Sequence, residues 1–478
     1  MYGVSDAVIE AFKTDGVHKD FKIILDNVEY YNDKIVDESF NLKQSIMDSE
    51  DFEAVGCIAS SLSLELRAQF PTKQKGKKIQ VFIKADNTLT WIPIFTGYVN
   101  KCQKTANGWR RSIEAYDFFY TMSGQSGNND GNTKKEYNIT DWYNSHYVTT
   151  VHGILVDVCN KYGLPVSPGD RALVNGSIEV NPSARKASEL SALDLIKECM
   201  KINGCFGYIK GDGAFSWRYL ELPSHDTDGW LYPSAFAFPQ GSLYPGQDTE
   251  HVAPDVNADN FIGEYENLQY EDFKMLPIDT VVVRDYEADT EQGSCGSGEN
   301  KYIINGNMFT YGKNKTEKDK AAKNLYDILN STYYVPFEAE LPGLPYLQCG
   351  DPVSFYDFVD DYGQASLQRF YILSRSLSGS QHLKDVFSAS GDEYKHEFSV
   401  DGKGQAANTD EIKDDLEQYV DDAVASASGC RIVSVTSLSD IPDPPAANTI
   451  YCIQSEIQIV ETIWTPDDQN ESTANQTT

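Results

Sequence analysis

The chain has 478 residues, a formal net charge of −32 and a sequence pI of about 4.5. This acidity argues against a protein that binds nucleic acid by neutralising phosphates, because like charges repel. A single hydrophobic core stops growing near ~250–300 residues, so we expect three or four modules. The 12% aromatic content, with 29 Tyr, favours β structure.

The nine cysteines are scattered singly along the chain and form no paired framework. An odd number without such a framework predicts reduced thiols. We also expect no export signal at the N-terminus and no membrane anchor, because no apolar run approaches the ~20 residues that span a bilayer.

The N-terminal part is predicted to be a helix followed by strands. Residues 1–17 hold the helix, which places Val8, Ile9 and Phe12 on one face. Residues 18–122 alternate apolar and polar side chains between short turns rich in Asn, Asp and Gly. This density of short strands predicts a first antiparallel β-barrel-like domain.

A segment rich in Gly, Asn and Ser separates this domain from an expected α+β domain at residues 136–225. Two helices are predicted in it. The first lies within residues 151–164, with Gly163 and Pro165 as its stop signals. The second covers residues 191–204, with Ser191 as its N-cap.

Residues 199–220, which begin within the second helix, contain two cysteines, four glycines and several aromatic residues. Cys199 and Cys205 lack a second Cys or His pair, so zinc spacing is not met. The glycines are not followed by Lys-Ser/Thr or a helix, which argues against a phosphate loop. Aromatic residues alternate on both sides of Lys-Gly-Asp-Gly, which predicts a β-hairpin with positive φ values at Asp212 and Gly213.

The C-terminal half is predicted to contain two further domains. Residues 226–334 read as an irregular and α+β insertion domain with one helix near its end, and residues 335–395 read as a second β-barrel-like domain. The expected fold class is therefore α+β and β-rich, with two antiparallel β-barrel-like modules, inserted α+β modules and a short C-terminal coiled-coil helix.

The coiled-coil helix is predicted at residues 405–428 and has acidic flanks. Its apolar residues follow a 4-3-4 spacing and would form an oligomer seam: Ile412, Leu416, Tyr419 and Ala423. Two heptads are too few for a stable coil, so neighbouring copies must be held together elsewhere. Residues 430–466 are expected to form a small β segment.

The search for catalytic and metal-binding motifs gives weak candidates. The glycines around Cys295 invite a nucleophile-elbow hypothesis, but an elbow joins a strand to a helix, and this motif is expected in a polar loop between strands. Residues 226–229 resemble the start of a calcium loop, but Trp230 takes the next ligand position. The seven histidines form no metal-binding pair. We therefore predict no catalytic residue, no metal and no cofactor.

Four stretches, taken in order, resemble the tail-hub proteins of long-tailed bacteriophages, the tail-associated or baseplate-hub family of phages and prophages of Gram-positive bacteria. They are residues 35–66, residues 96–123, residues 192–220, and residues 302–312 followed by a helix and residues 334–355. The resemblance covers about the first 395 residues.

The resemblance implies a homotrimeric structural hub in the virion, at the tip of the tail, assembled in the bacterial cytoplasm. Two barrel-like modules per chain would form a pseudo-sixfold ring on the hexameric distal tail protein. Such a hub caps the tail tube, touches the C-terminus of the tape-measure protein, joins receptor-binding or tip fibre proteins, and opens so that DNA passes without specific binding. Family members often carry a C-terminal lytic or receptor-binding portion, whereas this sequence stops after a short coil and one small segment.

Two alternative functions remain open. A tail-associated cell-wall lysin would use the Cys295 loop, and a host-polysaccharide adhesin would stack sugars on Trp142, Trp230 and Trp464. The strong acidity fits a channel through which DNA slides, but it equally fits an ordinary acidic surface.

Overall fold

The structure is a computed structural model that describes most of the chain. It describes residues 4–14, 17–46, 57, 59–70, 72–105, 109–123, 139–169, 171–184, 187, 189–220, 260–275, 277–330, 334–356, 367–391, 397–403, 431–435 and 449–453. The chain divides into two compact units, Met1–Asn408 and Thr409–Thr478, which are described separately.

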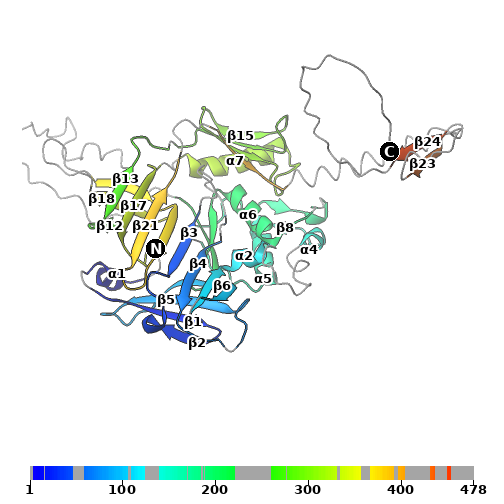
Figure 1. Cartoon of the computed structure of the whole chain (residues 1–478). Coiled ribbons are helices and arrows are strands. Elements are labelled where there is room, and N and C mark those ends of the chain that lie inside the picture. Colours follow the sequence, from blue (N-terminus) through cyan, green and yellow to red (C-terminus); the bar gives the residue numbers. More distant parts are fainter. Residues whose placement is uncertain are drawn as a thin grey trace, which may run out of the picture. The chain divides into compact units, whose positions relative to one another are not determined.

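The first unit is built on an 11-stranded sheet with the order β13-β17-β21-β20-β3-β4-β7-β6-β5-β1-β2 (Figure 1). Its strands, in chain order, are β1 (Lys19–Leu25), β2 (Val28–Tyr31), β3 (Asn41–Ser45), β4 (Ser61–Leu66), β5 (Lys78–Ala85), β6 (Ile92–Lys104), β7 (Arg111–Tyr116), β13 (Asn267–Tyr270), β17 (Phe337–Pro342), β20 (Ser374–Ser378) and β21 (Lys384–Ala389). Every second residue of β1, β5 and β7 is buried, as the alternating sequence predicts.

The pairing of β3 with β20 joins the two halves of the first unit. It is antiparallel and places Ser45 opposite Ser374 and Asn41 opposite Ser378. Strands of both expected barrel-like modules therefore belong to one sheet, and Figure 1 shows the blue strand β3 beside the yellow strands. Among the described strands, the end strands β13 and β2 each pair with one neighbour within this sheet.

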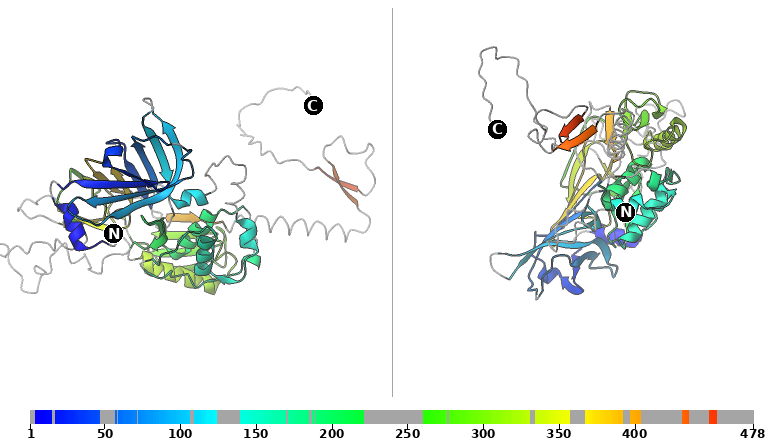
Figure 2. Two further views of the ribbon diagram at one scale, coloured as in Figure 1. Left: turned by 90° about the horizontal axis from the view of Figure 1, so that it is seen from below. Right: turned by 90° about the vertical axis from the view of Figure 1, so that its right-hand side faces the viewer.

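The expected α+β part contains α4 (Thr140–Asn144), α5 (Val151–Lys161), α6 (Ala192–Asn203) and the hairpin β10 (Phe206–Ile209)–β11 (Phe215–Arg218), with a short pair β8 (Thr149–Thr150)–β9 (Glu179–Val180). Ser191 caps α6 in a capping box with Asp194, and Gly204 ends it in the left-handed region at φ +64°. Figure 2 shows these helices to one side of the blue strands of the large sheet.

A four-stranded sheet forms the next layer, in the order β15 (Gly293–Gly296), β14 (Thr280–Arg284), β16 (Lys301–Asn305), β22 (Glu397–Asp401). The 15-residue helix α7 (Lys315–Leu329) packs on β14 and β15, and Asn314 caps it. Strand β22 lies beyond the predicted second β-barrel-like domain at residues 335–395 and pairs in parallel with β16.

Smaller elements complete the first unit: α1 (Asp6–Lys13), η1 (Asn32–Lys34), α2 (Phe118–Met122), η2 (Pro182–Ala184), and the sheet β12 (Phe261–Ile262)–β18 (Pro352–Tyr356)–β19 (Leu367–Tyr371). In the second unit, β23 (Arg431–Val435) and β24 (Thr449–Ile453) pair in parallel. The expectation of an α+β, β-rich fold is confirmed.

Candidate functional site: the joint around the β10–β11 hairpin

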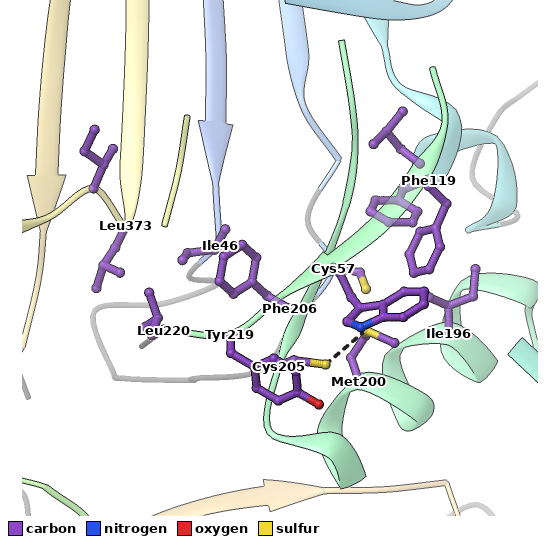
Figure 3. Close-up of a cluster of buried hydrophobic side chains, with 14 of the residues drawn as sticks. Ile46, Cys57, Phe119, Ile196, Met200, Cys205, Phe206, Tyr219, Leu220 and Leu373 are labelled. Carbon is purple, nitrogen blue, oxygen red and sulfur yellow. Dashed lines mark hydrogen bonds between the residues drawn. The ribbon is translucent and has the colours of Figure 1, made fainter. Parts of the chain in front are cut away.

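The hairpin β10–β11 lies in a cluster of buried side chains to which distant parts of the first unit contribute (Figure 3). The predicted hairpin is confirmed, and its strands pair from Phe206 opposite Arg218 to Ile209 opposite Phe215. The predicted turn geometry was half right. Gly213 has φ +93°, whereas Asp212 is not among the described residues with positive φ.

The turn of the hairpin contacts β6. The hydroxyl of Thr96 donates a 2.7 Å hydrogen bond to the carbonyl of Gly211. A Cβ on Gly213 would lie 2.8 Å from Cγ2 of Thr96, so the position requires glycine both for its φ and for this close approach. The turn is thereby fixed against the large sheet.

Asp117 joins β4, α2 and the hairpin on the N-terminal side. Its carboxylate accepts hydrogen bonds from the backbone N–H groups of Ser60, at 2.7 Å, and Phe119, at 2.9 Å. The Phe119 ring packs edge-on against Phe215 of β11, with 6.0 Å between centroids. Asp117 is 1% exposed, and burial raises its pKa to about 7 despite these hydrogen bonds, which act in the opposite direction.

The raised pKa of Asp117 has a testable consequence for stability. Because the folded state binds the proton more tightly than the unfolded chain, this stabilisation is full below pH 4 and is lost as the pH rises to about 7. Relative to Asp117→Asn, the wild-type free energy of unfolding should fall by up to about 4 kcal/mol between pH 4 and 7. Urea titrations at each pH measure this difference; a difference that stays constant or grows contradicts the assignment.

Asp351 and Gly350 connect the hairpin to the C-terminal half. Nη2 of Arg218 lies 2.7 Å from Oδ1 of Asp351, whose side chain is 2% exposed. Gly350 has φ +85°, and a Cβ there would lie 2.6 Å from the ring of Phe206. The end of β11 and the start of β10 thus both rest on the loop before β18.

That loop is held in turn by the buried pair Arg375–Asp385, which joins β20 to β21. The guanidinium donates to both carboxylate oxygens, with Nε at 2.8 Å from Oδ1 and Nη2 at 2.9 Å from Oδ2. Arg375 also donates to the carbonyls of Leu344 and Leu347, and the N–H of Leu344 donates to Asp385. Both side chains of the pair are 0% exposed. This bidentate geometry fixes the loop that carries Asp351.

A second group of contacts ties α6 to the four-stranded sheet. The N–H of Met308 donates a 3.0 Å hydrogen bond to the buried carboxylate of Glu198, and Lys201 lies 3.6 Å from the same carboxylate. Burial raises the pKa of Glu198 in spite of both partners. Lys201 also donates to the carbonyl of Asp401 at the end of β22. The strand is therefore fixed up to residues 401–403.

The thiols near the hairpin are buried, except for the partly buried Cys349, and none of them is poised to react. Burial raises the pKa of Cys57 and Cys349 to about 12 and the pKa of Cys199 and Cys205 well above the ordinary value. Since the thiolate is the nucleophile and the metal ligand, these groups are poor candidates for either role. The cysteines that the structure describes are free thiols. Figure 3 shows Cys205 directed toward Met200, 3.6 Å away.

The cavity beside the hairpin is small. It holds about 30 Å³ and is lined by Gln44, Ser45, Ile46, Ser60, Phe206, Tyr208, Ile209, Gln348 and Cys349. Pockets for small-molecule ligands are usually ~300–1,000 Å³, and a volume of this size suits about one water molecule. The side chains around the hairpin are thus closely packed, and the cavity between them is too small for a substrate.

Cys295, the residue of the elbow hypothesis, does not lie in a loop between strands. The structure corrects that prediction, because Gly293–Gly296 is strand β15, paired antiparallel with β14. The glycines allow close packing. A Cβ on Gly293 would lie 2.2 Å from the backbone carbon of Lys318 in α7, and the N–H of Ser294 donates to Asp319. The motif therefore serves packing of a strand against a helix.

Gly293→Ala should destabilise this layer, because helix backbone atoms have little freedom to move away from the new methyl group. We expect a loss of about 1–3 kcal/mol in the free energy of unfolding, whereas Cys295→Ala, at a partly exposed position, should cost less. Urea denaturation of both variants measures the difference. Equal stability of Gly293→Ala and the wild type would contradict the packing role.

Several predicted site residues lie outside the described residues: Ile412, Leu416, Tyr419, Ala423, residues 226–229, Trp230 and Trp464. Trp142 lies in α4, packed against the core. Among the residues that the structure describes, no three His, Cys, Asp or Glu side chains come together as a metal site, and no helix is long and apolar enough to cross a bilayer.

Sequence reasoning missed the charged residues of the joint. Arg375, Asp385 and Asp351 stand singly in strand and loop segments, and nothing in their local pattern marks them as buried. For Asp117, a signal was present: Asp directly before an apolar run is a common N-cap.

The structure is similar to solved structures of tail proteins. The 43 kDa tail protein of prophage MuSo2 from Shewanella oneidensis has a TM-score of 0.44 and 10% identity, over 77% of this chain and 97% of that chain. Prophage tail protein gp18 from Listeria monocytogenes EGD-e has a TM-score of 0.42 and 11% identity, over 79% and 95%. The tail protein from Neisseria meningitidis MC58 has a TM-score of 0.41 and 11% identity, over 81% and 99%.

All three are tail proteins. Their TM-scores lie below 0.5, so the likeness by itself assigns no function to this chain. No protein-family model and no curated protein sequence matches the chain.

Proposed function

We propose that the chain is a structural, non-enzymatic hub at the distal tip of a bacteriophage tail. Three copies would form a ring that caps the tail tube, contacts the hexameric distal tail protein and the end of the tape-measure protein, and carries receptor-binding or tip components. The ring would open for the passage of DNA. Its place would be the tail tip of the virion.

One observation carries the proposal: the four stretches that resemble the hub family meet around the hairpin β10–β11. The first stretch supplies Cys57, whose sulfur is 2.8 Å from the Cβ position of Gly207. The second supplies Thr96, which binds Gly211, and the last supplies Asp351, which pairs with Arg218. The third contains the hairpin itself. Residues that carry the resemblance thus build one structural joint.

These residues fix the relative positions of the elements that meet at the hairpin. The joint consists of a tight turn, close glycine contacts and buried, fully oriented ion pairs, and the cavity beside it is too small for a substrate. Such features hold parts of a molecule in one arrangement. A ring subunit that positions other tail proteins needs this rigidity, whereas an enzyme needs a pocket with converging reactive groups.

The predicted seam at Ile412, Leu416, Tyr419 and Ala423 supports a trimer. A short coil of this kind gains stability when a ring already holds its copies together, because the effective concentration is high. The net charge of −32 supports a passage that repels DNA and so does not retain it.

Analytical ultracentrifugation of the full chain tests the proposal. We expect a species of three times the chain mass, alone or with the distal tail protein, and we expect Ile412→Asp with Leu416→Asp to weaken it. Asp414→Asn, a change at a polar position of the same segment, is the control and should leave the trimer intact. A monomer at micromolar concentration even with the distal tail protein present contradicts the proposal.

A further inference from the structure

An ordered stack of aromatic rings lies at the surface of the α+β part, between α4 and α5. The ring of Trp142 packs on His146, with 4.7 Å between centroids, and His146 stacks on Tyr147 at 4.4 Å and 24°. Tyr147 is the outermost ring and is 65% exposed. Figure 1 places α4 at the margin of this part of the first unit.

Tyr147 is held although it is exposed. Its hydroxyl donates a 3.2 Å hydrogen bond to Oδ2 of Asp157, and Nε2 of His146 lies 3.0 Å from the same oxygen. His146 covers one face of the Tyr147 ring, and the hydrogen bond of the hydroxyl to Asp157 prevents the ring from rotating away. The opposite face is left to solvent in a defined orientation. A ligand that binds there does not have to order this side chain, which reduces the entropic cost of binding.

Charged groups of both signs lie at the two ends of the stack. The carboxylate of Asp157 lies at the edge of the Tyr147 ring. Lys161, one helical turn further along α5, places its Nζ 5.7 Å from the centre of the Trp142 ring. Val148, which is 50% exposed, extends the apolar surface. The stack thus combines the exposed ring of Tyr147 with a hydrogen-bond acceptor at its edge and a donor over Trp142, and the two charges balance.

We propose that Tyr147 is the platform of a saccharide-binding site that takes a pyranose unit of a neutral glycan. The C–H face of the sugar would pack on the open face of Tyr147. Sugar hydroxyls would donate to Asp157 and accept from Lys161. A pyranose has this combination of a flat apolar face and a polar rim, and aromatic side chains with few placed polar groups are what small-ligand sites use.

Other ligand classes fit the site less well. A protein interface needs about 800 Å² per partner, whereas the exposed apolar side chains at this site are Tyr147 and Val148. An anionic polymer would be repelled by a chain of net charge −32. A cationic ligand would compete with Lys161, which already lies over Trp142.

In this site the sugar would stack on Tyr147 and not on Trp142, which the adhesin hypothesis had named. Trp142 was one of the three expected sugar-stacking rings, but it packs against the core, contacts His146 and lies beneath Lys161. Tyr147 is the ring with an open face. This site goes beyond the proposed hub function and does not depend on it.

Saturation-transfer NMR and calorimetry with the full chain test the site. The probes are chitotriose, maltotriose, cellotriose and mannotriose. We expect at least one of them to bind with a millimolar Kd and to receive saturation mainly on the protons of one ring face. Tyr147→Ala should weaken binding by at least about tenfold. Tyr147→Phe, which keeps the ring but loses the hydroxyl, should weaken it about two- to fivefold.

The matched control is Tyr286→Ala, because Tyr286 is also an exposed tyrosine, at 48%. This variant should bind as the wild type does. Thermal melting and the far-ultraviolet spectrum of Tyr147→Ala should match the wild type, so that lost binding is not lost folding. Binding of none of the four glycans, or equal binding by Tyr147→Ala and the wild type, overturns the site.

Discussion

Arg375→Met is expected to lower the free energy of unfolding of the first unit by about 3–5 kcal/mol. The variant leaves the Asp385 carboxylate at 0% exposure without its bidentate partner and leaves the carbonyls of Leu344 and Leu347 without the guanidinium donor. A buried charge without compensation is costly, because water no longer solvates it. The loop that holds Asp351 should open first.

Urea denaturation measures the overall effect, and hydrogen exchange of the amides at residues 343–351 measures the local one. The matched control is Arg110→Met, because Arg110 faces Glu65 at 3.8 Å with both side chains partly exposed. That control should cost less than about 1 kcal/mol. The double variant Arg375→Met/Asp385→Leu should recover much of the loss, since no buried charge remains. Equal effects of Arg375→Met and Arg110→Met would contradict the role of the buried pair.

Lys318→Met is the second change with a large expected effect. Nζ of Lys318 lies 2.9 Å from Oδ2 of Asp285 and 2.7 Å from Oδ2 of Asp289, and the lysine side chain is 1% exposed. Its removal leaves two buried carboxylates facing each other without the cation. We expect a loss of about 3–5 kcal/mol in the free energy of unfolding.

The stability that Lys318 and Asp289 contribute depends on pH with the opposite sign to that of Asp117. Burial alone would raise the pKa of Asp289, but the hydrogen bond from Lys318 and two backbone N–H bonds outweigh it and hold the pKa below the ordinary value. This stabilisation is full above the unfolded pKa and is lost as the pH falls through the folded pKa. The difference between wild type and Lys318→Met should therefore shrink in acid.

Lys323→Met in the same helix is the matched control. Lys323 pairs with Asp327 at 2.7 Å, yet both side chains are more than half exposed. Exposed i,i+4 pairs contribute only about 0.3–0.5 kcal/mol. Urea denaturation of the two variants compares the same substitution at a buried and an exposed site. A loss below 1 kcal/mol for Lys318→Met would show that the cluster does not stabilise this layer.

Local features of the fold could be predicted from the sequence because their causes are local. Ser191 and Gly204 bound α6 by capping and by a left-handed φ, and the alternation around Gly213 defines the hairpin. The turn itself was predicted less well, since one glycine at positive φ suffices and Asp212 keeps ordinary geometry.

Long-range features could not be predicted in this way. The pairing of β3 with β20 brings together residues more than 320 positions apart, and neither strand carries a pattern that names its partner. Strand β22 was missed because its five residues follow the end of a meander and gain their place through pairing with β16. The motif around Cys295 read as a loop because strands rarely contain so many glycines; the close approach of α7 explains them.

In the candidate site, too, local features could be predicted from the sequence and long-range contacts could not. Asp117 had a recognisable N-cap position, but its burial depends on Phe119 and Phe215 packing across the joint. Arg375 and Asp385 look like ordinary surface residues of strands until the loop at residues 343–351 covers them. Charged residues that organise a joint are therefore visible only once the tertiary contacts are known.

Immunogold electron microscopy of phage particles, with an antibody raised against this chain, shows where the protein lies in the virion. We expect gold label at the distal tip of the tail, at the end that meets the host cell. Label along the tail tube, on the capsid, or absent from particles that contain the chain would contradict it.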